Sequence, residues 1–144
     1  MIMLAVSASW SADAVFGTWK LNATRSTFAG DTQPRSLTVR IEPHAKGEVF
    51  TLDRVEADGR TISSSSILYL DGEPRPLQDF GCSGIQSSRR EDSSTVEILR
   101  MCASGEWTRY VRRLSAPAKE MVLEIIEQHP DGRRFERRLV LEKR

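Results

Sequence analysis

The strongest constraint on the fold is the spacing of apolar residues, which recur at every second position along most of the chain after residue 15. In the clearest run, Leu37, Val39 and Ile41 alternate with polar neighbours. This alternation is typical of a strand with one buried and one solvated face. Further strands are predicted at residues 18–22, 48–55, 61–70, 83–90, 95–102, 107–114, 121–128 and 133–143, with a short piece at 75–77. The pattern therefore predicts nine or ten strands.

The breaks between these segments carry residues that favour tight turns. A glycine that can adopt positive φ stands between two predicted strands at Lys46-Gly47, Asp58-Gly59, Asp71-Gly72, Ser104-Gly105 and Asp131-Gly132. Turns of this kind join neighbouring strands antiparallel. The one alternative helix, over residues 117–128, is disfavoured because the segment is rich in β-branched residues.

A sheet of hairpin-linked strands has two exposed edges unless it closes on itself. We therefore predict an all-β fold, an antiparallel up-and-down barrel of eight to ten strands, with a β-sandwich as the alternative. A chain of 144 residues is long enough for one such domain, which we place at residues 15–144.

The first fourteen residues resemble a targeting segment rather than part of the barrel. They form an apolar run followed by small residues and an Ala-x-Ala pattern that ends at Ala14. This pattern indicates a signal peptide and a secreted or periplasmic protein, with a disordered N-terminal arm as the alternative. No segment approaches the roughly 18 consecutive apolar residues of a membrane span. A net charge of +1 argues against a nucleic-acid-binding protein.

The first predicted strand carries a motif that suggests a family. Residues 17–22 read Gly-Thr-Trp-Lys-Leu-Asn, and residues 26–28 follow with Ser-Thr-Phe. This opening resembles that of the lipocalin-like, or calycin, proteins, in particular small exported bacterial domains. The resemblance implies a barrel of eight to ten strands that holds a small apolar ligand.

The same resemblance assigns structural roles to two residues. Gly17 would let the chain enter the barrel at a crowded end, and Trp19 would plug that end beneath a cation from the closing strand. The candidate cations are Arg137 and Arg138. The related ten-stranded fatty-acid carriers use an Arg-x-Tyr pair near the C-terminus to hold a carboxylate, but the last strand here contains no Tyr. That pair is therefore not expected in this protein.

The two cysteines flank a predicted hairpin. If its turn centres on Asp92, Cys82 and Cys102 lie directly opposite each other on one face of adjacent strands. In an exported protein such a pair is usually a disulfide, with two reduced thiols as the alternative. A zinc site at these cysteines is not expected, because His44 and His129 are interpreted as solvated turn residues far away in the sequence.

Two arginines stand on apolar faces of their predicted strands. Arg112 shares a face with Tyr110, and Arg137 lies on the apolar face of the last strand. A desolvated guanidinium needs a partner. The partner is either an internal carboxylate, such as Glu97 or Glu124, or the carboxylate or phosphate of a bound ligand.

Two function classes remain after the search for motifs. No nucleophile, phosphate-loop or dinucleotide motif is present, so no enzyme is expected. We expect an exported, non-catalytic binding protein for a small hydrophobic molecule, which can be anionic, with Tyr110, Arg112 and Arg137 around its polar end. The alternative is a structural or protein-interaction module with a filled barrel that acts through its loops. No cofactor and no metal are expected. An internal cavity above roughly 300 Å³ would favour the binding protein.

Overall fold

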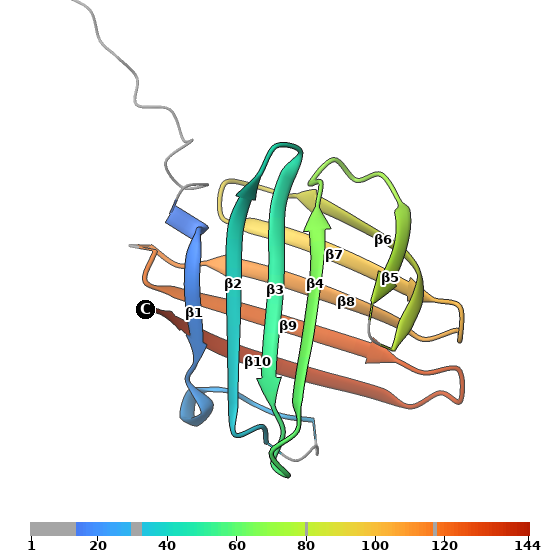
Figure 1. The fold of residues 1–144 in the computed structure, drawn as a ribbon, viewed down its shortest axis with the longest axis horizontal. Coiled ribbons are helices and arrows are strands. Elements are labelled where there is room, and N and C mark those ends of the chain that lie inside the picture. The colour runs from blue at the N-terminus through green and yellow to red at the C-terminus, as the bar shows by residue number, and fades with distance from the viewer. Residues whose placement is uncertain (1–13, 30–32, 80, 117) are drawn as a thin grey trace, which may run out of the picture.

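Ten antiparallel strands curve into a barrel in the computed structural model, which describes residues 14–29, 33–79, 81–116 and 118–144 (Figure 1). The strands are β1 (Gly17–Leu21), β2 (Ser36–His44), β3 (Gly47–Val55), β4 (Thr61–Leu68), β5 (Arg75–Asp79), β6 (Cys82–Arg90), β7 (Thr95–Cys102), β8 (Trp107–Leu114), β9 (Glu120–Gln128) and β10 (Arg134–Lys143). A short 3₁₀ turn, η1 (Ala23–Arg25), follows β1. Each predicted strand lies within two residues of an observed one. The alternative helix over 117–128 is replaced by β9.

The strands pair in the order β4-β3-β2-β1-β10-β9-β8-β7-β6-β5. The first and last strands therefore lie side by side, and Trp19 pairs with Lys143. This order confirms the predicted up-and-down barrel and excludes the β-sandwich. None of the helices in the described part of the chain is long and apolar enough to cross a membrane.

The barrel is nearly closed, because the backbone ladder is interrupted between β4 and β5. Side chains bridge this gap. Ser64 donates a hydrogen bond to Asp79 of β5, and Gln86 Nε2 of β6 donates to Ser66 Oγ at 3.2 Å. Ser64 and Ser66 of the serine run thus form a polar part of the wall, where hydrogen-bonding side chains replace backbone pairing.

One end of the barrel is filled by a dry core around Trp19, which is fully buried. Its indole N–H donates to the Val15 carbonyl oxygen at 2.9 Å. Other fully buried members of this core are Val39, Ile41, Met121, Leu123 and Leu141.

The cation over the indole is Lys143, whose Nζ lies 5.4 Å from the ring centroid, and not Arg137 or Arg138. The β1–β10 register explains the difference, because it pairs Trp19 with Lys143. Gly17 has φ of +131°, and a Cβ there would lie 3.3 Å from Lys143 Cε. Glycine is the residue that this crowded, left-handed position favours.

The predicted disulfide is present, and Cys82 and Cys102 have Cα atoms 5.1 Å apart. The predicted register of the hairpin is wrong, however, because Cys102 pairs with Gly84. The turn centres one residue further along than Asp92, so the pairing shifts by two residues. A shift of two keeps both side chains on the same face of the sheet, and the bond still forms.

Candidate functional site

The barrel contains a cavity of about 700 Å³, whose lining excludes Trp19 and includes exposed turn residues such as Asp58 and Gly81, which mark its mouth. Most of its wall consists of residues that the strand alternation turns inward. The apolar part includes Leu37, Phe50, Leu52, Ile98, Ile125 and Leu139. The polar part includes Arg54, Gln86, Arg100, Tyr110, Glu127 and Arg137. The interior is therefore hollow, and strands β3, β7, β9 and β10 each contribute both apolar and hydrogen-bonding side chains to its wall.

Two of the three predicted ligand-binding residues line this cavity. Burial raises the pKa of the Tyr110 hydroxyl, so the phenol stays protonated and can donate a hydrogen bond. That hydroxyl makes no hydrogen bond to any other residue that the structure describes. Arg137 Nη1 lies 3.4 Å from Glu127 Oε2 and donates to it. A phenol from β8 and a guanidinium from β10 thus face the same space.

The third predicted residue, Arg112, lies outside the cavity lining. Its side chain is buried in the dry end of the barrel, where Nη2 lies 2.9 Å from Oε1 of the buried Glu48. Burial lowers the pKa of Arg112, and the Glu48 carboxylate opposes that shift. The sequence left open whether the partner of Arg112 is an internal carboxylate or a bound ligand, and the structure shows an internal carboxylate. It is not one of the two named in advance, because Glu97 and Glu124 pair with other arginines.

A cavity-lining arginine that the sequence analysis missed is Arg100 on β7. Its Nη1 lies 3.3 Å from Asp79 Oδ2, and its Nη2 donates to Gln86 Oε1 at 2.9 Å. The guanidinium carbon lies 5.8 Å from the centroid of the Tyr110 ring. Arg100 shares a strand face with Ile98, so the rule that singled out Arg112 and Arg137 could also have found it.

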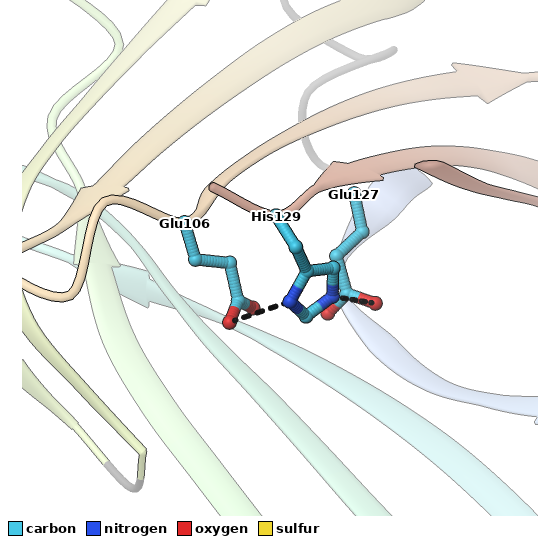
Figure 2. A group of neighbouring side chains, drawn as sticks. All are labelled: Glu106, Glu127 and His129. Carbon is cyan, nitrogen blue, oxygen red and sulfur yellow. Dashed lines mark ion pairs between the residues drawn. The ribbon is translucent and has the colours of Figure 1, made fainter. Parts of the chain in front are cut away.

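A half-buried cluster of Glu106, Glu127 and His129 lies at the mouth (Figure 2). His129 Nδ1 lies 3.5 Å from Glu106 Oε2, and His129 Nε2 lies 3.5 Å from Glu127 Oε2. Burial raises the pKa of Glu106, and a hydrogen bond with Glu127 raises it further. The His129 ring packs edge-on against Phe135 with centroids 5.4 Å apart. His129 therefore stands in a turn, as the sequence suggested, but its side chain is half-buried and not solvated.

This cluster brings ionisable groups within reach of one another, as an acid–base site requires. Two of its members, Glu106 and Glu127, line the cavity at its open end. The cluster therefore borders the space that a bound molecule would use, and its chemistry is that of carboxylates around an imidazole.

Comparison with known proteins identifies similar structures without similar sequences. No family model matches the chain, and no curated protein matches it in sequence. The ileal bile acid-binding protein of zebrafish, crystallised with cholic acid, aligns with a TM-score of 0.58 at 11% identity over 91% of this chain and 99% of its own. A fatty acid binding protein of Schistosoma mansoni in complex with arachidonic acid aligns with a TM-score of 0.59 at 13% identity, over 93% of this chain and 98% of its own.

Likeness at this level of identity establishes the fold alone. The two alignments cover 91% and 93% of this chain, which is nearly the whole barrel. The chain, a nearly closed antiparallel barrel of ten strands, therefore shares its fold with these two lipid-binding proteins.

Proposed function

We propose that this protein binds a small, mostly apolar molecule with an anionic end group inside its barrel and releases it unchanged. The observation that carries the proposal is the open cavity of about 700 Å³. Ligand sites commonly occupy about 300–1,000 Å³ and combine an apolar wall with a few polar groups. A barrel filled by its own side chains, the alternative from the sequence, would leave no such space.

The apolar wall supplies the main part of the expected affinity. A ligand that buries about 300 Å² of apolar surface gains about 7 kcal/mol at about 25 cal/mol per Å². Loss of translational and rotational freedom offsets several kcal/mol of this gain. A net affinity in the micromolar range then requires contributions from the polar end.

The polar end of the ligand would meet the Tyr110 hydroxyl and the Arg137 guanidinium. Arg137 already contacts Glu127, so a ligand carboxylate would compete with that side chain. The Arg-x-Tyr pair of the fatty-acid carriers is absent from β10, but Tyr110 and Arg137 offer the same two chemical groups from different strands. Charge-assisted bonds of this kind are stronger than bonds between neutral groups.

The ligands of the two similar structures support the proposal. Those proteins were crystallised with cholic acid and with arachidonic acid. Both compounds join a large apolar body to one carboxylic acid. The apolar side chains of the cavity suit the first part, and the Tyr110 and Arg137 groups suit the second.

We propose further that the protein is secreted or periplasmic. The Cys82–Cys102 disulfide supports this location, because such bonds persist in oxidising compartments. The expected signal peptide supports it from the sequence, although residues 1–13 lie outside the described part of the chain. The first fourteen residues would then be removed from the barrel domain of residues 15–144.

The test compares dodecanoate with dodecanol as competitors for a fluorescent probe bound in the cavity. We expect dodecanoate to bind about tenfold more tightly, equal to about 1.4 kcal/mol, because only the carboxylate engages the polar groups. Tyr110→Phe and Arg137→Gln should each reduce this preference. Arg134→Gln, on an exposed side chain of the same strand, should leave it unchanged.

Each outcome bears on one part of the proposal. Failure of both compounds to displace the probe would refute ligand binding in the cavity. Equal affinities, unaffected by Arg137→Gln, would refute the anionic end group while retaining the apolar site.

A further inference from the structure

Two hairpin turns meet at the mouth of the barrel and hold three metal-ligating side chains together. The turn between β7 and β8 packs directly on the turn between β9 and β10, since a Cβ on Gly105 would lie 2.9 Å from Pro130 Cγ. The first turn is tied to the disulfide, because the Glu106 carbonyl accepts from Cys102 N at 2.8 Å. The second is closed by His129 N, which donates to the Arg133 carbonyl at 2.9 Å. The turns therefore present Glu106 and His129 from fixed backbone positions.

The geometry of the three side chains suits a bound cation. One ligand atom from each of Glu106, Glu127 and His129 can be chosen so that all lie within 4.8 Å of one another. Metal–ligand bonds of about 2.0–2.2 Å place the ligand atoms of one tetrahedral ion about 3.4 Å apart. The 3.5 Å separation between His129 Nδ1 and Glu106 Oε2 already meets this value. Glu127 Oε2 lies 3.5 Å from the other ring nitrogen, Nε2, so the Glu127 side chain must turn toward Nδ1 to complete the set.

The two carboxylates of the cluster favour a bound cation, and neighbouring arginines reduce its affinity. Two carboxylates approach each other closely at this point, and the imidazole between them offers a lone pair when it is neutral (Figure 2). The nearest opposing charge is Arg137, whose Nη1 lies 3.4 Å from Glu127 Oε2. Arg133 also acts on Glu106 as a more distant positive charge. A cation must therefore compete with Arg137 for one carboxylate oxygen.

We propose that Glu106, Glu127 and His129 bind one divalent transition-metal ion, with Zn²⁺ as the representative, at the mouth of the barrel. One imidazole and two carboxylates form a borderline donor set, which suits zinc. Calcium takes six to eight oxygen ligands, more than this cluster offers, and soft ions require thiolates, which the disulfide removes. Three protein ligands leave at least one position for water. The sequence suggested no metal, and such a site would give the protein a second ligand besides the molecule proposed inside the barrel.

Because the same residues could instead form a protonated ion-pair cluster, the test must detect the metal itself. The full chain without a polyhistidine tag is titrated with Zn²⁺ by calorimetry, and with Co²⁺ by visible absorption. We expect one ion per chain with a Kd on the order of 10 µM. We also expect intense visible absorption from the bound Co²⁺, which is typical of this ion at a low coordination number.

Matched variants assign the site. His129→Gln and Glu106→Gln should each weaken Zn²⁺ binding by at least about 10–100-fold. The controls are His44→Gln, the other histidine of the chain, and Glu136→Gln on an exposed side chain. Both control variants should bind Zn²⁺ as tightly as the unmodified protein does. Arg137→Gln should tighten binding, because it removes the competing cation from Glu127.

The proposal is overturned if Zn²⁺ produces no saturable binding or Co²⁺ keeps the spectrum of the free aquo ion. Equal losses in His44→Gln and His129→Gln would also overturn it. Circular dichroism of each variant separates loss of the site from loss of the fold. Displacement of the fluorescent probe by dodecanoate, measured in metal-free buffer, reports separately on the proposed carriage function.

Discussion

Loss of the buried Arg112 guanidinium should destabilise this barrel strongly. Arg112 and Glu48 are each only 2% exposed, and their charged atoms approach to 2.9 Å. Arg112→Met leaves the Glu48 carboxylate in a dry core. Its remaining cationic neighbour is then Arg90, at 3.9 Å and one-third exposed.

The size of the loss follows from the cost of an unpaired buried charge. Removal of one member of a buried pair typically costs about 3–5 kcal/mol. We expect the lower end, about 3 kcal/mol, because Arg90 can compensate in part. The double change Glu48→Leu with Arg112→Met removes both charges, and we expect it to lie within about 1 kcal/mol of the unmodified protein or to be more stable.

Equilibrium unfolding in urea measures all four members of this double-mutant cycle. An exposed pair provides the control, since Arg60→Met beside Asp58 should cost at most about 1 kcal/mol. Additive losses in the double variant would refute the buried pair. The double variant should also retain its affinity for dodecanoate, because neither residue lines the cavity.

Three further perturbations test other parts of the structure. Replacing Cys82 and Cys102 by Ser should lower the free energy of unfolding by about 3 kcal/mol, by the chain-entropy estimate for a loop of about twenty residues; unchanged urea unfolding would contradict the bond. Trp19→Ala should cost about 3–5 kcal/mol in the same assay, and a loss below about 1 kcal/mol would show that the indole does not fill the core. Bidentate contact with Arg75 and a backbone N–H hold the pKa of Asp71 well below its usual range, so its stabilising effect is present at neutral pH and is lost as the pH falls through the folded-state pKa. Thermal unfolding should therefore show Asp71→Asn with a lower Tm at pH 7 and a shrinking difference below about pH 4; a constant difference would exclude the ionic contribution.

The strands were predictable because their signal is local. Period-two alternation and glycine-containing turns are each encoded within a few neighbouring residues, so all ten strands are visible in the sequence. The hairpin register was less predictable. The turn around Asp92 can centre on either of two residues, and this choice moves the partner of Cys102 from Cys82 to Gly84.

The site was only partly predictable because its contacts are remote in the sequence. Alternation identified Tyr110 and Arg137 as inward-facing, but it could not show that Arg112 meets a carboxylate 64 residues away. The mouth cluster follows from the register of the β8–β9 hairpin, which pairs Trp107 with Gln128 and so sets Glu106 opposite His129 one step further along. The sequence analysis assigned no register to this hairpin and therefore missed the contact.

NMR of the protein with bound dodecanoate shows directly whether the ligand lies inside the barrel. Nuclear Overhauser effects between the ligand methylenes and side-chain methyl groups report which face of the wall the ligand touches. We expect contacts with Ile98, Ile125 and Leu139, which line the cavity. Contacts confined to Ile85 and Leu99, which are 44% and 39% exposed, would place the ligand on the outer surface and refute binding in the cavity.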